Sequence, residues 1–298
     1  MDALAPAPAT ADPHDPAALE AAADALAAFL DGRRALVLSG AGVSTDSGIP
    51  DYRGPGRVRR DPMRYQQFVG AAAQRRRYWA RSSVGWPYTA AARPNAVHGA
   101  VARLERRGVA AAVLTQNVDG LHQRAGSRRV LELHGSLATV VCLGCGARSA
   151  RARFQERLVA ANPRFAARYL PTELGPDDVA PDGDVEIPDA AADDLVVPAC
   201  EACGGVLKPD VTFFGENVPK PRVERAFALA DAADALVVLG SSLTVYSGYR
   251  FVRRAKAAGR PVAIVNDGAT RGDGDADLRL HARLAPLLER VAAHLGAA

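Results

Sequence analysis

The chain has 298 residues, of which 48% are hydrophobic, 23% charged and 6% aromatic, a composition typical of a folded globular protein. Its formal net charge of +4 is too small to indicate nucleic-acid binding. No apolar run is long enough to span a membrane, and the first 20 residues lack the basic start of a signal or transit peptide. We therefore expect a soluble cytoplasmic protein with neither a nucleic-acid nor a membrane partner.

The first predicted element is a helix over Pro16–Leu30, because apolar residues recur there at helical spacing and Asp31-Gly32 follows as a stop. The next is a buried strand over 35–39, which leads directly into Gly40-Ala-Gly42. A buried strand entering a glycine turn is typical of the first β-α unit of a nucleotide-binding sheet.

Strands and helices alternate along the rest of the chain. Further strands are predicted at 111–115, 130–133, 211–214, 235–239 and 262–265, and helices at 95–107, 223–233 and 249–258. Such alternation indicates an α/β protein with a mostly parallel sheet covered on both faces. The cysteine pairs and an arginine-rich stretch interrupt the alternation and are interpreted as insertions.

Charge is segregated along the sequence. Residues 54–93 contain nine arginines against one acidic residue, and residues 161–199 contain nine acidic residues against two arginines. These stretches are interpreted as two solvated faces. The alternative for the basic stretch is a surface or pocket for anionic ligands.

The four cysteines form two pairs, Cys142/Cys145 and Cys200/Cys203, each with two intervening residues. Thiolates at this spacing are suited to one tetrahedral Zn²⁺, and a site closed by four sulfurs is structural rather than catalytic. Disulfides or a redox pair are the alternatives, and a cytoplasmic location disfavours disulfides. The 54 residues between the pairs are predicted to form an acidic, proline-rich excursion.

Five polar or glycine-containing clusters follow predicted strands, and open α/β sheets bind ligands at such strand ends. They are 40–54 (GAGVSTDSGIPDYRG), 115–119 (TQNVD), 133–135 (LHG), 240–242 (GSS) and 266–268 (NDG). The first departs from a GxGxxG fingerprint because Thr45 stands at the third glycine. Its many polar residues nevertheless favour a ligand loop. His134 alone would be interpreted as a core histidine.

Seven motifs occur in a characteristic order: GAGVSTDSGIPDYRG, TQNVDGLH, ELHG, the paired CxxC, LKPDVTFFGENVP, GSSLTVYSG and IVNDG. Together they resemble the sirtuins, which are NAD-dependent protein deacylases, over about residues 20–290. The excursion containing APDGDV, with PDYR, RYWAR and SSLTVYSGYRF, is most similar to class II. That branch includes the mitochondrial sirtuin credited with lipoamidase and ADP-ribosyltransferase activities.

The resemblance implies a Rossmann-type doubly wound parallel sheet with an inserted zinc-binding module and a small helical module. It divides the chain into a flexible tail (1–19), three parts of the Rossmann-type domain (20–54, 96–140 and 207–298), a helical insertion (55–95) and a zinc module with the acidic excursion (141–206). NAD and an acyl-lysine protein or peptide are expected to meet in the cleft between these parts.

The resemblance also implies roles for individual residues. The expected NAD-binding residues are Gly40, Ala41, Gly42, Ser44, Asp51, Tyr52, Arg53, Gln116, Asn117, Asp119, Gly240, Ser241, Ser242, Asn266, Asp267, Gly268 and Leu284. Those expected to bind the substrate peptide by strand addition are Phe214, Gly215, Glu216, Leu243 and Val245. The expected catalytic residues are His134, Asn117 and Asp119, and the zinc ligands are Cys142, Cys145, Cys200 and Cys203.

The expected reaction releases nicotinamide and transfers the acyl group to ADP-ribose, with His134 as the general base for a ribose hydroxyl. Two positions bear on specificity. Tyr52 stands where many sirtuins have phenylalanine. Tyr78 and Arg81 have the spacing that desuccinylating sirtuins use for an acidic acyl group, and the alternative is that Arg81 is one more arginine of an arginine-rich helix.

Three other functions remain open from the sequence. Mono-ADP-ribosyl transfer would use the same NAD pocket with a different acceptor. A non-catalytic NAD sensor or zinc scaffold is disfavoured because His134, Asn117 and Asp119 occur together. A dehydrogenase is disfavoured because no acidic residue follows the glycine turn within a compact βαβ unit.

Overall fold

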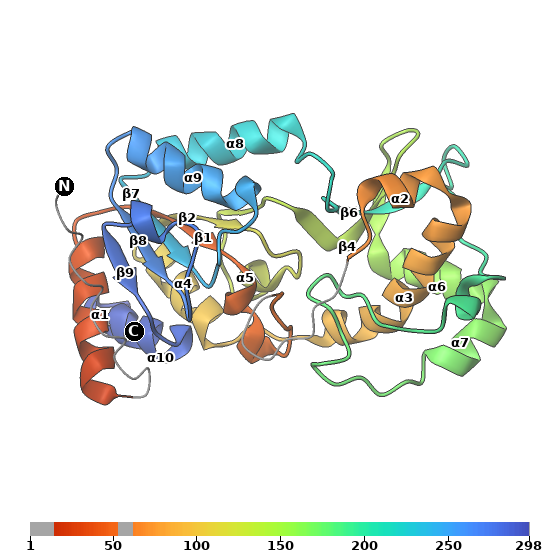
Figure 1. Ribbon diagram of the computed structural model, residues 1–298, viewed down its shortest axis with the longest axis horizontal. Coiled ribbons are helices and arrows are strands. Elements are labelled where there is room, and N and C mark those ends of the chain that lie inside the picture. The colour runs from red at the N-terminus through yellow and green to blue at the C-terminus, as the bar shows by residue number, and fades with distance from the viewer. Residues whose placement is uncertain (1–14, 53–61, 298) are drawn as a thin grey trace, which may run out of the picture.

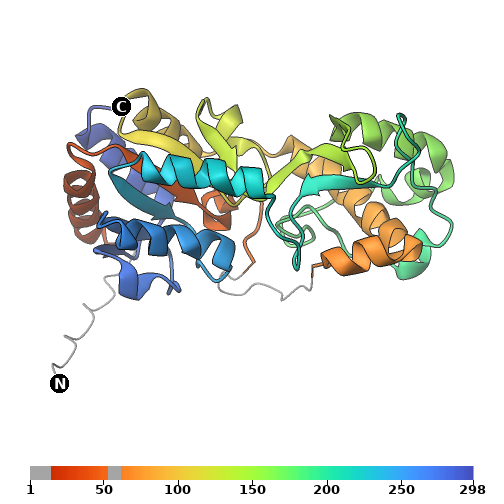
Figure 2. The same ribbon diagram turned by 90° about the horizontal axis from the view of Figure 1, so that it is seen from above.

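The structure is a computed structural model that describes residues 15–52 and 62–297 (Figure 1). It consists of two lobes side by side, and the molecule is elongated along the line that joins them (Figure 2). The larger lobe surrounds a six-stranded sheet and the smaller lobe surrounds a three-stranded sheet. Among helices in the described residues, none has both the length and the apolar composition needed to cross a bilayer.

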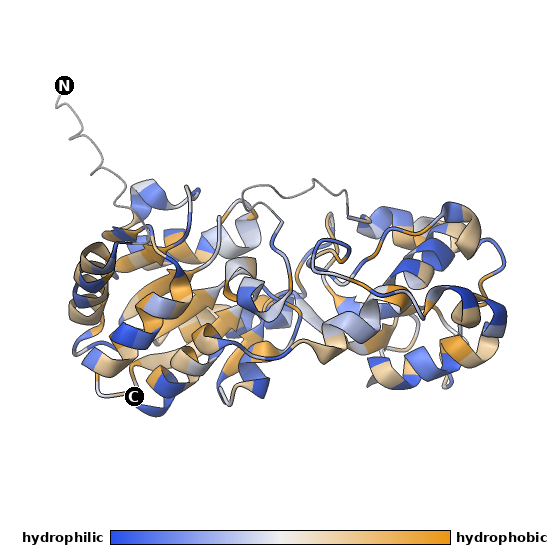
Figure 3. Cartoon of the chain, turned by 90° about the horizontal axis from the view of Figure 1, so that it is seen from below, coloured by the Kyte–Doolittle hydropathy of each residue, from blue (hydrophilic) through white to orange (hydrophobic). Residues whose placement is uncertain are grey.

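The larger sheet confirms the predicted parallel arrangement. Its strand order is β3-β2-β1-β7-β8-β9, and every neighbouring pair is parallel. The strands are β1 (Ala35–Ser39), β2 (Ala110–Thr115), β3 (Val130–Glu132), β7 (Ala235–Leu239), β8 (Val262–Val265) and β9 (Leu278–Leu280). Every residue of β1, β7 and β8 is buried, because helices cover both faces of the sheet. Apolar residues accordingly concentrate in these strands (Figure 3).

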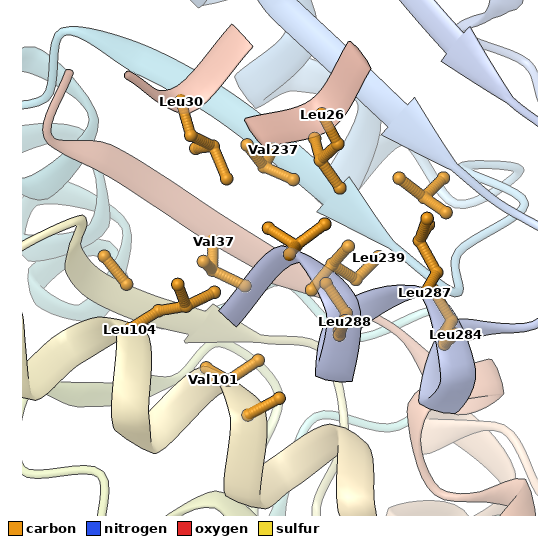
Figure 4. Close-up of a cluster of buried hydrophobic side chains, with 14 of the residues drawn as sticks. Leu26, Leu30, Val37, Val101, Leu104, Val237, Leu239, Leu284, Leu287 and Leu288 are labelled. Atoms are coloured by element: carbon orange, nitrogen blue, oxygen red, sulfur yellow. The ribbon is translucent and has the colours of Figure 1, made fainter. Parts of the chain in front are cut away.

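Two sets of helices cover the sheet. One face carries α1 (Pro16–Leu30), α4 (Ala96–Arg106) and α10 (Leu284–His294), and the other carries α8 (Lys220–Asp231) and α9 (Tyr246–Ala257). Alternate residues of β1 pack in the two hydrophobic clusters on opposite faces of the sheet. Val37 packs in the cluster that contains Leu26 and Leu288 (Figure 4), whereas Leu38 packs in the cluster that contains Phe251.

Helix α1 has the bounds that the sequence predicts. Asp15 caps its first turn, since its side chain accepts a hydrogen bond from the backbone N–H of Ala17 at 3.0 Å, and Pro16 occupies the start of the helix. Gly32, with φ of 68°, follows the C-terminal end.

The smaller lobe is built on an antiparallel sheet of order β5-β4-β6. Its elements are β4 (Gly135–Cys142), β5 (Arg148–Ala150), β6 (Leu207–Val211), α2 (Tyr65–Gly70), α3 (Ala72–Ala91), α6 (Arg151–Ala161) and α7 (Pro163–Tyr169). Trp79 and Phe154 pack at its centre with ring centroids 4.2 Å apart. The buried guanidinium of Arg151 lies 5.2 Å from the Trp79 ring centroid, which stabilises a charge inside this aromatic core.

The strand predicted at 211–214 is wrong. The observed strand, β6, ends at Val211 and belongs to the antiparallel sheet of the smaller lobe. The predicted range began after Pro209, whereas the observed strand contains this proline. Because β6 is an edge strand, a proline without a backbone N–H is tolerated there. Residues 212–214 leave the sheet and run along the cleft between the lobes, where Tyr65 donates its backbone N–H to the carbonyl of Phe214 at 2.9 Å.

Candidate active site

Two glycine turns meet at the ends of neighbouring strands β1 and β7. The backbone N–H of Gly42 donates to the carbonyl of Gly240 at 2.9 Å. A Cβ on Gly40 would lie 2.6 Å from Cβ of Ser241 and 2.7 Å from the Gly240 oxygen, so a larger residue cannot be accommodated without a shift. The two turns therefore form one closely packed floor at the switch point of the sheet, where doubly wound proteins bind nucleotides.

This floor gives a direct test. Gly240 has φ of 59°, and a Cβ there would lie 2.8 Å from the backbone of Gly42. Gly259 has φ of 67° but no heavy atom within 4 Å of an added Cβ. Both alanine substitutions incur the left-handed backbone strain of about 1–2 kcal/mol. We expect Gly240→Ala to lower the free energy of unfolding further and to weaken NAD binding, as measured by denaturation and calorimetry, while Gly259→Ala leaves NAD binding unchanged. Equal effects of the two substitutions would contradict the packed floor.

A polar network fixes the residues that follow β2. Asn117 donates its side-chain N–H groups to the Gly40 carbonyl and to Oγ of Ser44, both at 3.0 Å. Ser44 in turn donates to Oδ2 of Asp119 at 2.7 Å, and Gln116 donates to Oγ of Ser241 at 2.8 Å. Hydrogen bonds within the protein thus hold together the glycine turn, the residues after β2 and the turn after β7.

These residues line one cavity of about 750 Å³ between the lobes. That volume lies within the range of small-molecule and cofactor sites. The sequence-predicted residues that line it are Gly40, Ala41, Gly42, Ser44, Asp51, Tyr52, Tyr78, Gln116, Asn117, Asp119, His134, Phe214, Gly215, Glu216, Gly240, Ser241, Ser242, Leu243, Val245, Asn266, Asp267 and Gly268. The fold therefore brings together residues separated by more than 200 positions in the chain.

His134 is one of the residues that line this cavity. Its Nδ1 lies 2.9 Å from the carbonyl oxygen of Gln116, which can only accept a hydrogen bond, so Nδ1 carries the proton. Nε2 is then unprotonated and lies 2.8 Å from Oγ of Ser247. Burial is the main cause that lowers the pKa of His134 to about 4; the hydrogen bond with the Gln116 carbonyl opposes this shift, and the charges of Arg222 and Arg250 add to it. The imidazole is consequently a neutral base at physiological pH.

Ser247 lines the cavity and contacts His134, and it was not among the residues predicted from the sequence. It lies in the first turn of α9 and is 113 positions from His134. The segment just before it, 243–246, was expected to bind peptide, but no spacing rule connects a helix start with a histidine at the end of another strand. Pro181, Asp182 and Asp184 from the acidic excursion also line the cavity, and no role for them was predicted from the sequence.

Two predicted site residues have other settings. Leu284 packs in the core against α1 and α4 and is absent from the described residues that line the cavity (Figure 4). Arg81 is also absent from that lining, because its guanidinium is ion-paired with Asp184 and Glu186. Arg53 lies outside the described residues.

The four cysteines converge at one end of the smaller sheet. Their sulfur atoms all lie within 4.8 Å of one another, with Cys142 and Cys203 3.5 Å apart and Cys145 and Cys200 3.8 Å apart. These separations exclude disulfide bonds and match the roughly 3.8 Å between sulfurs on a tetrahedral Zn²⁺ with Zn–S bonds of about 2.3 Å. A Cβ on Gly205 would lie 2.9 Å from the Cys142 sulfur, so glycine leaves room for the cluster. The site fits one structural zinc ion.

Fold and site define a Rossmann-type nucleotide-binding protein with an inserted four-cysteine lobe. Residues 40–247 match the model of the family described as the Sir2 family, and the chain belongs to that family. It is 54% identical over 258 residues to the NAD-dependent protein deacetylase of Xanthomonas campestris pv. campestris, with 86% of each chain covered. It is also 54% identical over 276 residues to NAD-dependent protein deacetylase 1 of Streptomyces coelicolor, covering 91% of this chain and 90% of that protein.

Solved structures of the family have the same fold. A complex of Sir2 with a p53 peptide and NAD⁺ superimposes with a TM-score of 0.71 at 30% identity, covering 92% of this chain and 98% of that one. A structure of Sir2 bound to an acetylated peptide superimposes with a TM-score of 0.70 at 30% identity, covering 92% and 99%.

Proposed function

We propose that the protein is an NAD-dependent protein-lysine deacetylase that releases nicotinamide and O-acetyl-ADP-ribose. One observation carries the proposal: a neutral, partly buried His134 lines the same cavity as both glycine turns and as the peptide-binding candidates Phe214 and Leu243. The names of the relatives and the acetylated peptide in a related structure support the same reaction.

The residues around the cavity have different roles in the proposed reaction. When bound, NAD supplies the ribose carbon that receives the acyl oxygen as nicotinamide leaves. The glycine turns allow its pyrophosphate to approach the backbone, and Asn117 and Asp119 hold Ser44 and the loop in place. Nε2 of His134 accepts the proton of a ribose hydroxyl, since Nδ1 is already committed to the Gln116 carbonyl.

The finer assignments are also part of the proposal. The motifs PDYR and SSLTVYSGYRF support the class II branch and a similarity to the lipoamidase sirtuin. Four free thiols arranged for a metal support a reducing, cytoplasmic location. Leu284 and Arg53 stay candidate NAD-binding residues on the resemblance alone.

The experiment is mass spectrometry of the purified protein mixed with NAD and an acetyl-lysine peptide. We expect nicotinamide, deacetylated peptide and O-acetyl-ADP-ribose in equal amounts, and none of them without NAD. Transfer of ADP-ribose to the protein or to an added acceptor, with the peptide left acetylated, would instead establish the transferase alternative. Accumulation of NADH would indicate a dehydrogenase.

A further inference from the structure

A tight hairpin in the acidic excursion reaches the cavity. We call residues 179–186 the acidic hairpin. Val179 and Val185 form an antiparallel bridge, and Ala180 donates its backbone N–H to the carbonyl of Asp184 at 2.7 Å. Gly183, with φ of 77°, closes the turn by donating to the Ala180 carbonyl at 2.8 Å. The turn therefore has a defined shape rather than that of an open loop.

Helix α3 is shaped to receive this hairpin. A Cβ on Gly85, in the middle of the helix, would lie 2.1 Å from the Gly183 oxygen and 2.8 Å from Cγ2 of Val185. Glycine inside a helix is about 1 kcal/mol less favourable than alanine. Here it allows the hairpin backbone to rest directly on the helix. Val84 of α3 packs with both valines of the hairpin, which fixes the position of the turn.

The hairpin brings carboxylates to the end of the cavity where Tyr78 lies. Asp182 and Asp184 line the same cavity as His134 and the buried ring of Tyr78. Burial, Asp182 and Asp184 all raise the pKa of the Tyr78 phenol. Burial and then Asp182 raise the pKa of Asp184 to about 7, although Arg81 lowers it. This end of the cavity is therefore already unfavourable for negative charge.

Arg81 is the residue that the resemblance implies for an acidic acyl group, and in this structure it is already paired. Its Nε donates to Oδ1 of Asp184 at 3.0 Å, and its Nη2 lies 2.9 Å from Oδ2 of the same residue. Nη2 also lies 2.7 Å from Oε1 of Glu186. The forked pairing with Asp184 is largely buried, with 12% and 10% of the two side chains exposed. One guanidinium is thus shared by two carboxylates of the hairpin.

We infer that the acidic hairpin makes this enzyme selective for uncharged acyl groups and excludes acyl groups that end in a carboxylate, with Arg81 holding the hairpin instead of receiving the substrate. The inference rests on the proposed deacylase function. A second carboxylate about 5 Å from one like charge, at an effective dielectric constant of about 20, is disfavoured roughly 10²-fold. Wild type is therefore expected to favour an acetyl-lysine over a succinyl-lysine peptide by about that factor.

The test compares kcat/KM for acetyl- and succinyl-lysine peptides of one sequence. The double variant Asp184→Asn/Glu186→Gln releases Arg81 from both carboxylates, and we expect its succinyl-to-acetyl ratio to rise at least tenfold. Adding Arg81→Gln should abolish that rise. Asp189→Asn is the matched control, because Asp189 belongs to the same excursion but pairs with the exposed Arg77 at 2.9 Å and does not line the cavity. Its ratio should equal that of wild type.

Dissociation constants of the same two peptides, labelled for fluorescence anisotropy, separate this inference from the proposed function because they require no turnover. Binding that follows the predicted ratios without deacylation would overturn the function and leave the inference standing. Equal use of both peptides by wild type, or an unchanged ratio in the double variant, would overturn the inference. If the double variant does not fold, Glu186→Gln alone carries the test with a smaller rise, since that carboxylate is 66% exposed.

Discussion

The His134→Ala variant is expected to lose about 10²–10⁴-fold in kcat/KM for deacetylation while it still binds NAD and the acetylated peptide. Alanine removes the unprotonated Nε2 from the cavity but leaves the Gln116 backbone and the glycine turns in place. Steady-state kinetics with the acetyl-lysine peptide, together with calorimetric titration of NAD, measure the two effects separately.

His281→Ala is the control for this substitution, because His281 contacts Arg279 and is absent from the described cavity lining. The pH profile adds a second criterion. Because the pKa of His134 is lowered to about 4, the imidazole stays neutral from pH 8 to pH 6, and its titration should not reduce kcat/KM in that range. A His134→Ala variant with activity within a few-fold of wild type would contradict the role of general base.

Removal of zinc is expected to unfold the smaller lobe and abolish activity together. Zinc binding to four-cysteine and related peptides contributes about 10–16 kcal/mol of folding free energy at neutral pH, more than most single domains have in total. Strand β4 ends at Cys142, a predicted zinc ligand, and begins at Gly135, next to His134. At that beginning, Thr212 donates its backbone N–H to the His134 carbonyl at 2.7 Å. Loss of the sheet therefore displaces the base.

The measurement is circular dichroism and activity after treatment with a chelator, with zinc content determined by mass spectrometry. Added Zn²⁺ should restore both signals, whereas Mg²⁺ should not, because it binds oxygen ligands in preference to thiolates. A zinc-free protein with an unchanged melting temperature would show that the four cysteines do not support this lobe. Cys203→Ser should have the same effect as the chelator.

The inner strands of the larger sheet were predictable because local pattern determines them, whereas the edge strand β9 (Leu278–Leu280) was not predicted. Strands 35–39, 235–239 and 262–265 have their predicted bounds, since each is an apolar run buried on both faces and bounded by breakers. Strand β6 was not predictable in the same way, because its partner, β4, lies more than 60 residues earlier and its proline is tolerated only at a sheet edge. Tertiary pairing, rather than local propensity, sets its limits.

The candidate-site residues that were predictable are those that belong to a sequence motif. The glycine turns and His134 stand at strand ends, a position that the chain order alone reveals. Ser247 and the acidic hairpin reach the cavity through packing between elements about 100 residues apart. The ion pairs that occupy Arg81 depend on a turn whose position on α3 is set by the missing side chain at Gly85. Such contacts cannot be inferred from the spacing of residues in the sequence.

The order of strands in the larger sheet has a consequence for how the chain is made. Strand β1 pairs with β7, residue by residue, across a separation of 200 positions, from Ala35 to Ala235. A ribosome adds about 5–20 residues per second, so β1 waits roughly 10–40 s for this neighbour. Throughout that time one edge of a strand that is fully buried in the folded protein is without its partner. Nascent chains of this protein therefore depend on protection from aggregation until β7 emerges.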